Sequence, residues 1–76
     1  MTHQEITKGL SNVGVLVTPY KAFDGFIPFH IHPSKYVEVM DFVKKNNLDI
    51  FLQNKKRIDW VEGVESYDCD ATIWFS

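Results

Sequence analysis

The chain has a single cysteine, Cys69, among its 76 residues, so it cannot form an internal disulfide. Small secreted domains usually depend on several disulfides, and this scarcity therefore excludes that class and favours a reducing, cytoplasmic location. Long apolar runs are missing too: no segment approaches the roughly 18 consecutive apolar residues of a membrane-spanning helix. Residues 1–10, with His3, Glu5 and Lys8, do not resemble a signal peptide. We expect no association with a membrane.

Basic residues are outnumbered by acidic ones, eight to ten, which gives a net charge of −2. Nucleic-acid-binding domains usually carry a basic surplus that neutralises phosphates, so a nucleic-acid partner is not expected. The charge is also unevenly distributed. Residues 44–57 carry a net charge of +4, whereas residues 58–76 contain five acidic residues and no basic one. The last quarter of the chain is therefore strongly acidic.

No linker, repeat or low-complexity stretch interrupts the sequence, and we expect one domain over residues 1–76. A chain this short buries only about 60% of the surface that it exposes when unfolded. Against this, 45% of the residues are apolar and 14% are aromatic, and each aromatic side chain can bury roughly 150–250 Å². The domain can therefore fold without a disulfide or metal. A homo-oligomer would bury further aromatic surface.

A short helix is predicted at the start of the chain. Thr2 and Glu5 have the spacing of a capping box, and Gly9 could close a helix over residues 3–8. Because one or two turns are only marginally stable alone, frayed residues 1–9 are the alternative.

The main helix is predicted from the N-cap Ser34 to about Asn46. Lys44 and Lys45 complement the negative end of its dipole, and Asn46 and Asn47 are residues that tolerate the left-handed conformation that often follows a helix. Apolar residues recur at helical spacing and predict a broad buried stripe. These residues are Tyr36, Val37, Val39, Met40, Phe42 and Val43.

A hairpin is predicted around Asp24 and Gly25, a dipeptide that favours a type I′ turn. This turn would pair residues 20–23 with residues 26–29, and Pro28, which lacks an amide hydrogen, would place its strand at a sheet edge. Paired residues share a face of the sheet. The inner face would carry Tyr20, Ala22, Ile27, Phe29 and Ile31, and the outer face Lys21, Phe23, Phe26, Pro28, His30 and His32.

Further strands are predicted from β-branched and alternating patterns. A β-branched run favours a strand over residues 12–17, and apolar residues alternate with polar ones over residues 48–53, 57–60 and 69–75. The predicted fold is a small α+β domain with the order (short α)-β-β-α-β-β-β. Its sheet would be mainly antiparallel, with one main helix packed on one face.

Catalytic motifs are missing. The chain has no phosphate-binding glycine loop, nucleophile elbow or zinc-binding cysteine pair. His30 and His32 would share a strand face, but the sequence supplies no third metal ligand at a characteristic spacing. Asp68 and Asp70 would raise the pKa of Cys69, which disfavours a nucleophilic thiolate. We therefore expect no catalytic residue, no metal site, no cofactor and no enzymatic activity.

Two surfaces are candidates for binding a protein partner. The first is a predicted acidic loop over residues 60–70, in which aromatic and acidic residues alternate; the alternative is an ordinary solvated loop. Its candidate contacts are Trp60, Glu62, Glu65, Tyr67 and Asp68. The second is the tip of the first hairpin, where Phe23 and Phe26 flank the turn. The favoured function is stoichiometric binding to a larger protein, as an inhibitor or modulator of the kind encoded by phages and mobile elements.

A second hypothesis is an oligomeric sponge or sensor for a small anionic ligand such as a nucleotide. Lys55, Lys56 and Arg57, in a predicted turn, would contact its phosphate, with His30 or His32 nearby. A third hypothesis is a small metal-dependent enzyme. Three basic residues are too few for strong binding to duplex nucleic acid.

Overall fold

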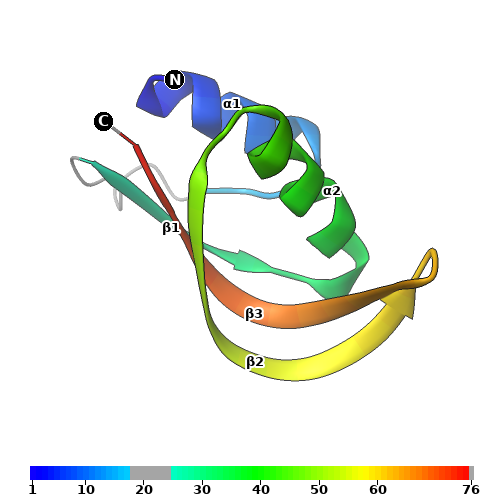
Figure 1. The fold of residues 1–76 in the computed structure, drawn as a ribbon. Coiled ribbons are helices and arrows are strands. Elements are labelled where there is room, and N and C mark those ends of the chain that lie inside the picture. The colour runs from blue at the N-terminus through cyan, green and yellow to red at the C-terminus, as the bar shows by residue number, and fades with distance from the viewer. Residues whose placement is uncertain (18–24, 76) are drawn as a thin grey trace.

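The computed structural model describes residues 1–17 and 25–75 as two helices on one three-stranded antiparallel sheet. Its elements are α1 (His3–Asn12), β1 (Phe26–Ile31), α2 (Pro33–Lys45), β2 (Asp49–Val61) and β3 (Val64–Trp74). β3 lies between β1 and β2, and both helices lie on the same side of the sheet (Figure 1). The α+β class, the antiparallel sheet and the main helix on one sheet face are confirmed.

α1 begins at the predicted capping box and runs further than predicted. The Thr2 amide donates to the Glu5 carboxylate at 2.9 Å, which is the main cause of the lowered pKa of Glu5, and the Glu5 amide donates to the Thr2 hydroxyl at 3.2 Å. The helix then continues to Asn12. A Cβ at Gly9 would lie 2.3 Å from the ring of Phe42. The predicted end at Gly9 is wrong, because this glycine permits close helix packing instead of capping.

The predicted strand over residues 12–17 is also wrong. Asn12 belongs to α1, the chain turns at Val13 and Gly14, and no strand occurs among residues 13–17. Gly14 has a φ of 88°, in the left-handed region that favours glycine. Val15 is nevertheless buried, with 5% of its surface exposed. The β-branched run therefore contributes to the core without pairing with a strand.

α2 has His32 as its N-cap instead of Ser34. Nδ1 of His32 accepts a hydrogen bond from the Ser34 amide at 3.2 Å, and Pro33 occupies the first helical position, where no amide donor is needed. β1 ends at Ile31, so His32 does not lie on the same strand as His30. The predicted pair of histidines on one strand face is therefore wrong.

The C-terminal end of α2 agrees with the prediction. Lys44 and Lys45 occupy the last turn, and Asn47 has a φ of 57°. The Phe42 carbonyl accepts two hydrogen bonds from Asn46, one from its side-chain amide at 2.9 Å and one from its backbone amide at 3.1 Å.

β2 continues through the predicted turn at residues 53–57. The regular pairing with β3 is interrupted by a bulge, in which residues 54–56 stand opposite Cys69 alone. Asn54 has a φ of 54°, and its side chain donates to Asp70 at 2.9 Å. Bulges bend a strand and increase its twist, and Figure 1 shows β2 and β3 curving together along their length. The two predicted strands are therefore one bent strand.

β2 and β3 are joined by a two-residue turn at Glu62 and Gly63. Their φ values, 53° and 76°, are both positive, as a type I′ turn requires. Val61 pairs with Val64 across the turn. The acidic loop predicted over residues 60–70 is therefore wrong: apart from the turn, this segment belongs to the two strands of a hairpin.

The core lies between the helices and the inner face of the sheet. The predicted inward positions Ile27, Phe29 and Ile31 are buried, with at most 8% exposed, and Tyr20 and Ala22 lie outside the described residues. Ile27, Phe29 and Ile31 pair with three buried residues of β3, and both helices add apolar side chains to the core. The other core residues are Ile6, Leu10, Val15, Val39, Val43, Cys69, Ala71 and Ile73.

Substitution of Ile6 by alanine tests whether α1 is an integral part of the fold. Ile6 is fully buried, and Ile→Ala replacements at such sites cost about 2–5 kcal/mol. We expect the free energy of unfolding, measured in urea, to fall by an amount in this range. Lys8→Ala, on the exposed side of α1, should change it by less than about 0.5 kcal/mol. Equal, small effects would mean that α1 is frayed; Ile6→Val gives a milder test if the alanine variant does not fold.

Candidate functional site

The exposed end of the β2–β3 hairpin gathers side chains that the sequence placed in a loop. Tyr67 lies two positions before the buried Cys69 on β3, so it shares the inner face of the sheet. Ile58 pairs with Tyr67, and Trp60 pairs with Glu65, which places all four on this face. Together with Tyr36 of α2 they are called the hairpin patch. Trp60 is 72% exposed and Ile58 is 51% exposed.

Tyr67 connects the hairpin patch to α2. Its ring packs edge-to-face on the ring of Tyr36, with centroids 5.3 Å apart, and the ammonium group of Lys55 lies 4.8 Å from the centroid of the Tyr67 ring. Burial raises the pKa of Tyr67, and the nearby carboxylate of Glu65 raises it further. The patch thus combines aromatic rings, a carboxylate and one cation from the bulge.

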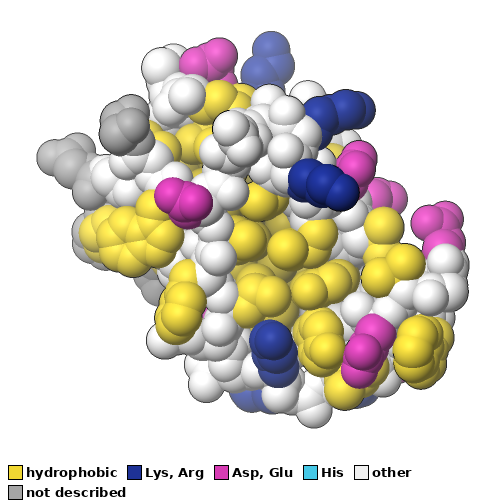
Figure 2. Space-filling view, viewed as in Figure 1, with side chains coloured by type: hydrophobic (Ala, Val, Ile, Leu, Met, Phe, Trp, Pro, Cys, Tyr) yellow, Lys and Arg dark blue, Asp and Glu magenta, His cyan; other side chains and the backbone are white. Residues whose placement is uncertain are grey.

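The hairpin patch extends an apolar surface that begins at the core. Figure 2 shows hydrophobic side chains gathered between α2 and β2, with basic and acidic side chains around them. Leu48, Ile50 and Leu52 are half-buried against the core along this side. Beyond them, Ile58 and Trp60 are much more exposed, because the hairpin reaches past the N-terminal end of α2 (Figure 1). The least covered apolar groups on this face are therefore those of the patch.

Asp68 lies on the opposite, outer face of the sheet and does not belong to the hairpin patch. Nε2 of His30 lies 2.6 Å from Asp68, and Nδ1 lies 2.9 Å from Asp70, which also accepts the hydrogen bond from Asn54. A protonated imidazole can donate from both nitrogens. Hydrogen bonds to Asp70 and then Asp68 raise the pKa of His30, and the bond from His30 is the main cause of the lowered pKa of Asp70.

The five candidate phosphate contacts do not surround one point. Lys55 lies over the Tyr67 ring, while Arg57 forms an ion pair with Asp59 at 2.9 Å. His32 caps α2, and His30 lies between two carboxylates, which would repel a phosphate. Lys56 is exposed in the bulge. The structure therefore does not bring these residues together as the anionic-ligand hypothesis requires.

Cys69 lies inside the core. Its side chain is fully buried, and burial is the main cause of its raised pKa, with smaller contributions from Asp68 and Asp70. Within residues 1–17 and 25–75, no group of three or more histidine, cysteine or acidic side chains is placed to hold a metal ion.

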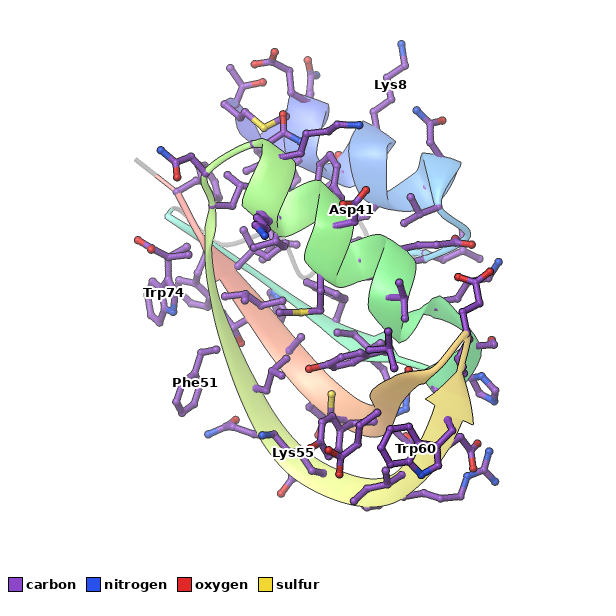
Figure 3. All side chains as sticks on the ribbon, turned by 45° about the vertical axis from the view of Figure 1, so that its right-hand side comes forward. Lys8, Asp41, Phe51, Lys55, Trp60 and Trp74 are labelled. Carbon is purple, nitrogen blue, oxygen red and sulfur yellow. The ribbon has the colours of Figure 1, made fainter. Side chains whose placement is uncertain are left out.

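The second predicted contact surface is only partly described. Phe26 is half-buried and packs on Trp74, with ring centroids 5.2 Å apart, and Phe23 lies outside the described residues. Phe51 and Trp74, both about half exposed, lie on the outer face. Figure 3 shows these two side chains at the opposite end of the molecule from Trp60.

A hollow of about 360 Å³ lies where α2 ends and β2 begins. Its walls include Asn46, Asp49 and Trp74 as well as Met1. The carbonyl end of α2 and the Asp49 carboxylate make its surroundings negative, and none of the predicted contact residues lines it. The hollow therefore has little in common with a nucleotide site.

Two members of the hairpin patch, Tyr36 and Ile58, were not predicted as contact residues. The sequence pattern places Tyr36 in the buried helix stripe and Ile58 in a half-buried strand. A better sign was the Glu62-Gly63 dipeptide, which is suited to a two-residue hairpin turn between Val61 and Val64. Interpreting it as a turn would have paired Trp60 with Glu65 across two strands instead of placing both in a loop.

No known protein-family model matches the chain, and no curated protein or solved structure is significantly similar to it. Within the part of the chain that the structure describes, no helix is long and apolar enough to cross a membrane. Any function must therefore be inferred from the geometry of these residues.

Substitution of His30 by glutamine should alter the pH dependence of stability. Because the pKa of His30 is raised in the folded protein above its ordinary value of 6.5, its stabilising effect is fully present below pH 6.5 and is lost as the pH rises through the folded-state pKa. We expect the wild type to be more stable than His30→Gln in acid and the difference to shrink in base. Urea unfolding between about pH 5 and pH 9 measures this. An Asp59→Asn control should show the same pH dependence of stability as the wild type. A difference in unfolding free energy between the wild type and His30→Gln that stays constant with pH would contradict the raised pKa of His30.

The burial of Cys69 predicts slow reaction with thiol reagents. We expect Ellman's reagent at neutral pH to leave the native protein unmodified, because the sulfur is inaccessible and its pKa is raised. In urea the same reagent should release one equivalent of its chromophore. Since the chain has one cysteine, the signal reports this site alone. Rapid reaction of the folded protein would show that the core opens at this position.

Proposed function

We propose that the protein acts without catalysis, by binding a larger protein through the hairpin patch and thereby inhibiting or modulating it. The observation that carries this proposal is the exposure of Trp60, 72%, beside the half-exposed Ile58 at the end of a hairpin. Exposed apolar groups that lie together on a rigid element are typical of contact surfaces. Tryptophan is also among the residues that contribute most to protein interfaces.

Burial of Trp60 would provide a substantial part of the binding energy. Covering its exposed surface would contribute about 3 kcal/mol, from the area of an indole side chain and the free energy per unit of buried apolar surface. Tyr67 is already held against Tyr36, so this part of the patch would lose little rotational freedom on binding. A partner that offers an apolar pocket for the indole would therefore fit.

Charge favours a partner with a basic rim. Glu62 and Glu65 lie at the turn and beside Trp60, and both are exposed. Asp59, in contrast, already pairs with Arg57 on the outer face. Complementary charge around an apolar contact raises the rate of association and excludes wrong partners.

The contact is proposed for the face of the hairpin and not for the edge of β2. Exposed lysines and a bulge are features that protect a strand edge against pairing with another strand. β2 has both, at Lys55, Lys56 and the bulge of residues 54–56. The partner would therefore approach Trp60 and Ile58 from the inner face.

Affinity capture from cells of the native host, with the wild type and matched variants, tests the proposal. Trp60→Ala should lower the affinity for the captured partner by about tenfold or more, as expected for a central interface tryptophan. Glu62→Lys with Glu65→Lys should slow association and reverse its dependence on salt. Both variants alter exposed side chains and should keep the melting temperature close to that of the wild type.

Phe51→Ala is the matched control, because Phe51 is an exposed aromatic residue on the outer face. It should bind the partner as the wild type does. Asp68 is unsuitable for charge reversal, since it pairs with His30 and its loss would disturb the sheet. Undiminished capture by Trp60→Ala, or equal loss with Phe51→Ala, would refute the hairpin patch as the contact.

A further inference from the structure

The position of Lys55 indicates which chemical group the hairpin patch attracts. Its ammonium group lies over the face of Tyr67, 4.8 Å from the ring centroid, which is within the range of cation–π attraction. Lys55 stands in the bulge and is itself exposed. The patch therefore already holds a cation from its own chain.

The surroundings of Tyr67 would suit a larger cation equally well. Trp60 lies on the same face, diagonally across the strand pair, and is the most exposed aromatic side chain among the described residues. Glu65 pairs with Trp60 and lies close enough to Tyr67 to raise the pKa of its hydroxyl. No residue within the described ranges forms an ion pair with Glu65 at 4 Å or less. Two aromatic side chains and a carboxylate that has no ion-pair partner among the described residues therefore share one face of the hairpin.

We infer that the hairpin patch binds an arginine side chain of the partner, with the guanidinium group stacked on Trp60 and Tyr67 and paired with Glu65. Guanidinium is planar and weakly hydrated, stacks on aromatic rings, and donates two parallel hydrogen bonds to a carboxylate. An ammonium group is compact and strongly hydrated, so lysine fits this combination less well. The inference rests on the proposed function and identifies the chemistry of the residue recognised.

Lys55 would then compete with the incoming arginine for the Tyr67 ring. Both are cations, so their like charges repel each other when both lie against the same ring. Binding of arginine would require Lys55 to turn away into solvent. Removal of the Lys55 side chain should therefore strengthen the binding of arginine. Removal of the neighbouring Lys56 side chain should change only the long-range electrostatic repulsion of the arginine.

The test uses a pair of blocked tetrapeptides, acetyl-Gly-Arg-Arg-Gly-amide and its counterpart with citrulline in place of both arginines. Citrulline has nearly the same shape as arginine and no charge. Two-dimensional NMR of the ¹⁵N-labelled full chain would follow the indole N–H of Trp60, assigned with Trp60→Phe, and the Tyr67 amide. The arginine peptide should shift both signals with a dissociation constant on the order of millimolar, and the citrulline peptide should not.

Lys55→Ala should bind the arginine peptide about two- to five-fold more tightly than the wild type. Lys56→Ala, which removes the same charge one residue away, is the matched control and should give a smaller gain. Glu65→Gln should weaken binding of the arginine peptide and leave the spectrum of the protein otherwise unchanged. All three positions are exposed, so the variants should fold.

Equal shifts with the arginine and citrulline peptides would overturn the inference, as would identical affinities of Lys55→Ala and Lys56→Ala. A lysine peptide that binds as tightly as the arginine peptide would show that the site recognises charge and not guanidinium. These failures are distinct from failure of the proposed function. If Trp60→Ala abolishes partner capture while the peptides behave alike, the patch is the contact but arginine is not what it recognises.

Discussion

In the middle of β2, three residues stand opposite one residue of β3, and the sheet bends there. On one side of this bulge the strands are covered by α2 and form the core. On the other side the hairpin extends past the N-terminal end of α2 and carries the exposed Ile58 and Trp60. The bulge also places Asn54 against Asp70 on the outer face and Lys55 over Tyr67 on the inner face. The shape of the molecule and the composition of its exposed end therefore have one geometric origin.

The same bend explains how a small core coexists with a large exposed indole. A flat sheet of this length would need a longer helix layer to cover its inner face. Here the helices cover one half, and α1 adds Ile6 and Leu10 to that half through the close contact between Gly9 and Phe42. The covered half can supply the stability of the fold, so the other half is available for contacts. Stability and recognition are thus separated along the strands.

Much of this architecture can be read from the sequence, and the errors have identifiable causes. The bulge adds two residues to β2 relative to β3. Because two is an even number, Leu52 and Ile58 face the same side of the sheet whether the residues between them form a bulge or a turn between two strands. Local pattern cannot distinguish these cases. His32 as an N-cap was obscured because imidazole is an uncommon cap, and the role of Gly9 depends on Phe42, far away in the chain. Such tertiary contacts leave no periodic signal.

The order of the strands has a consequence for biogenesis. β3 is the central strand, yet it follows β1 and β2 in the chain. Phe26 in β1 pairs with Trp74, so the ribosome must release almost the whole described chain before the first strand finds its neighbour. The hairpin of β2 and β3, in contrast, needs only local contacts and can close quickly. During synthesis β1 therefore has no neighbouring strand until β3 emerges, and the hairpin of β2 and β3 then acts as the template on which β1 pairs.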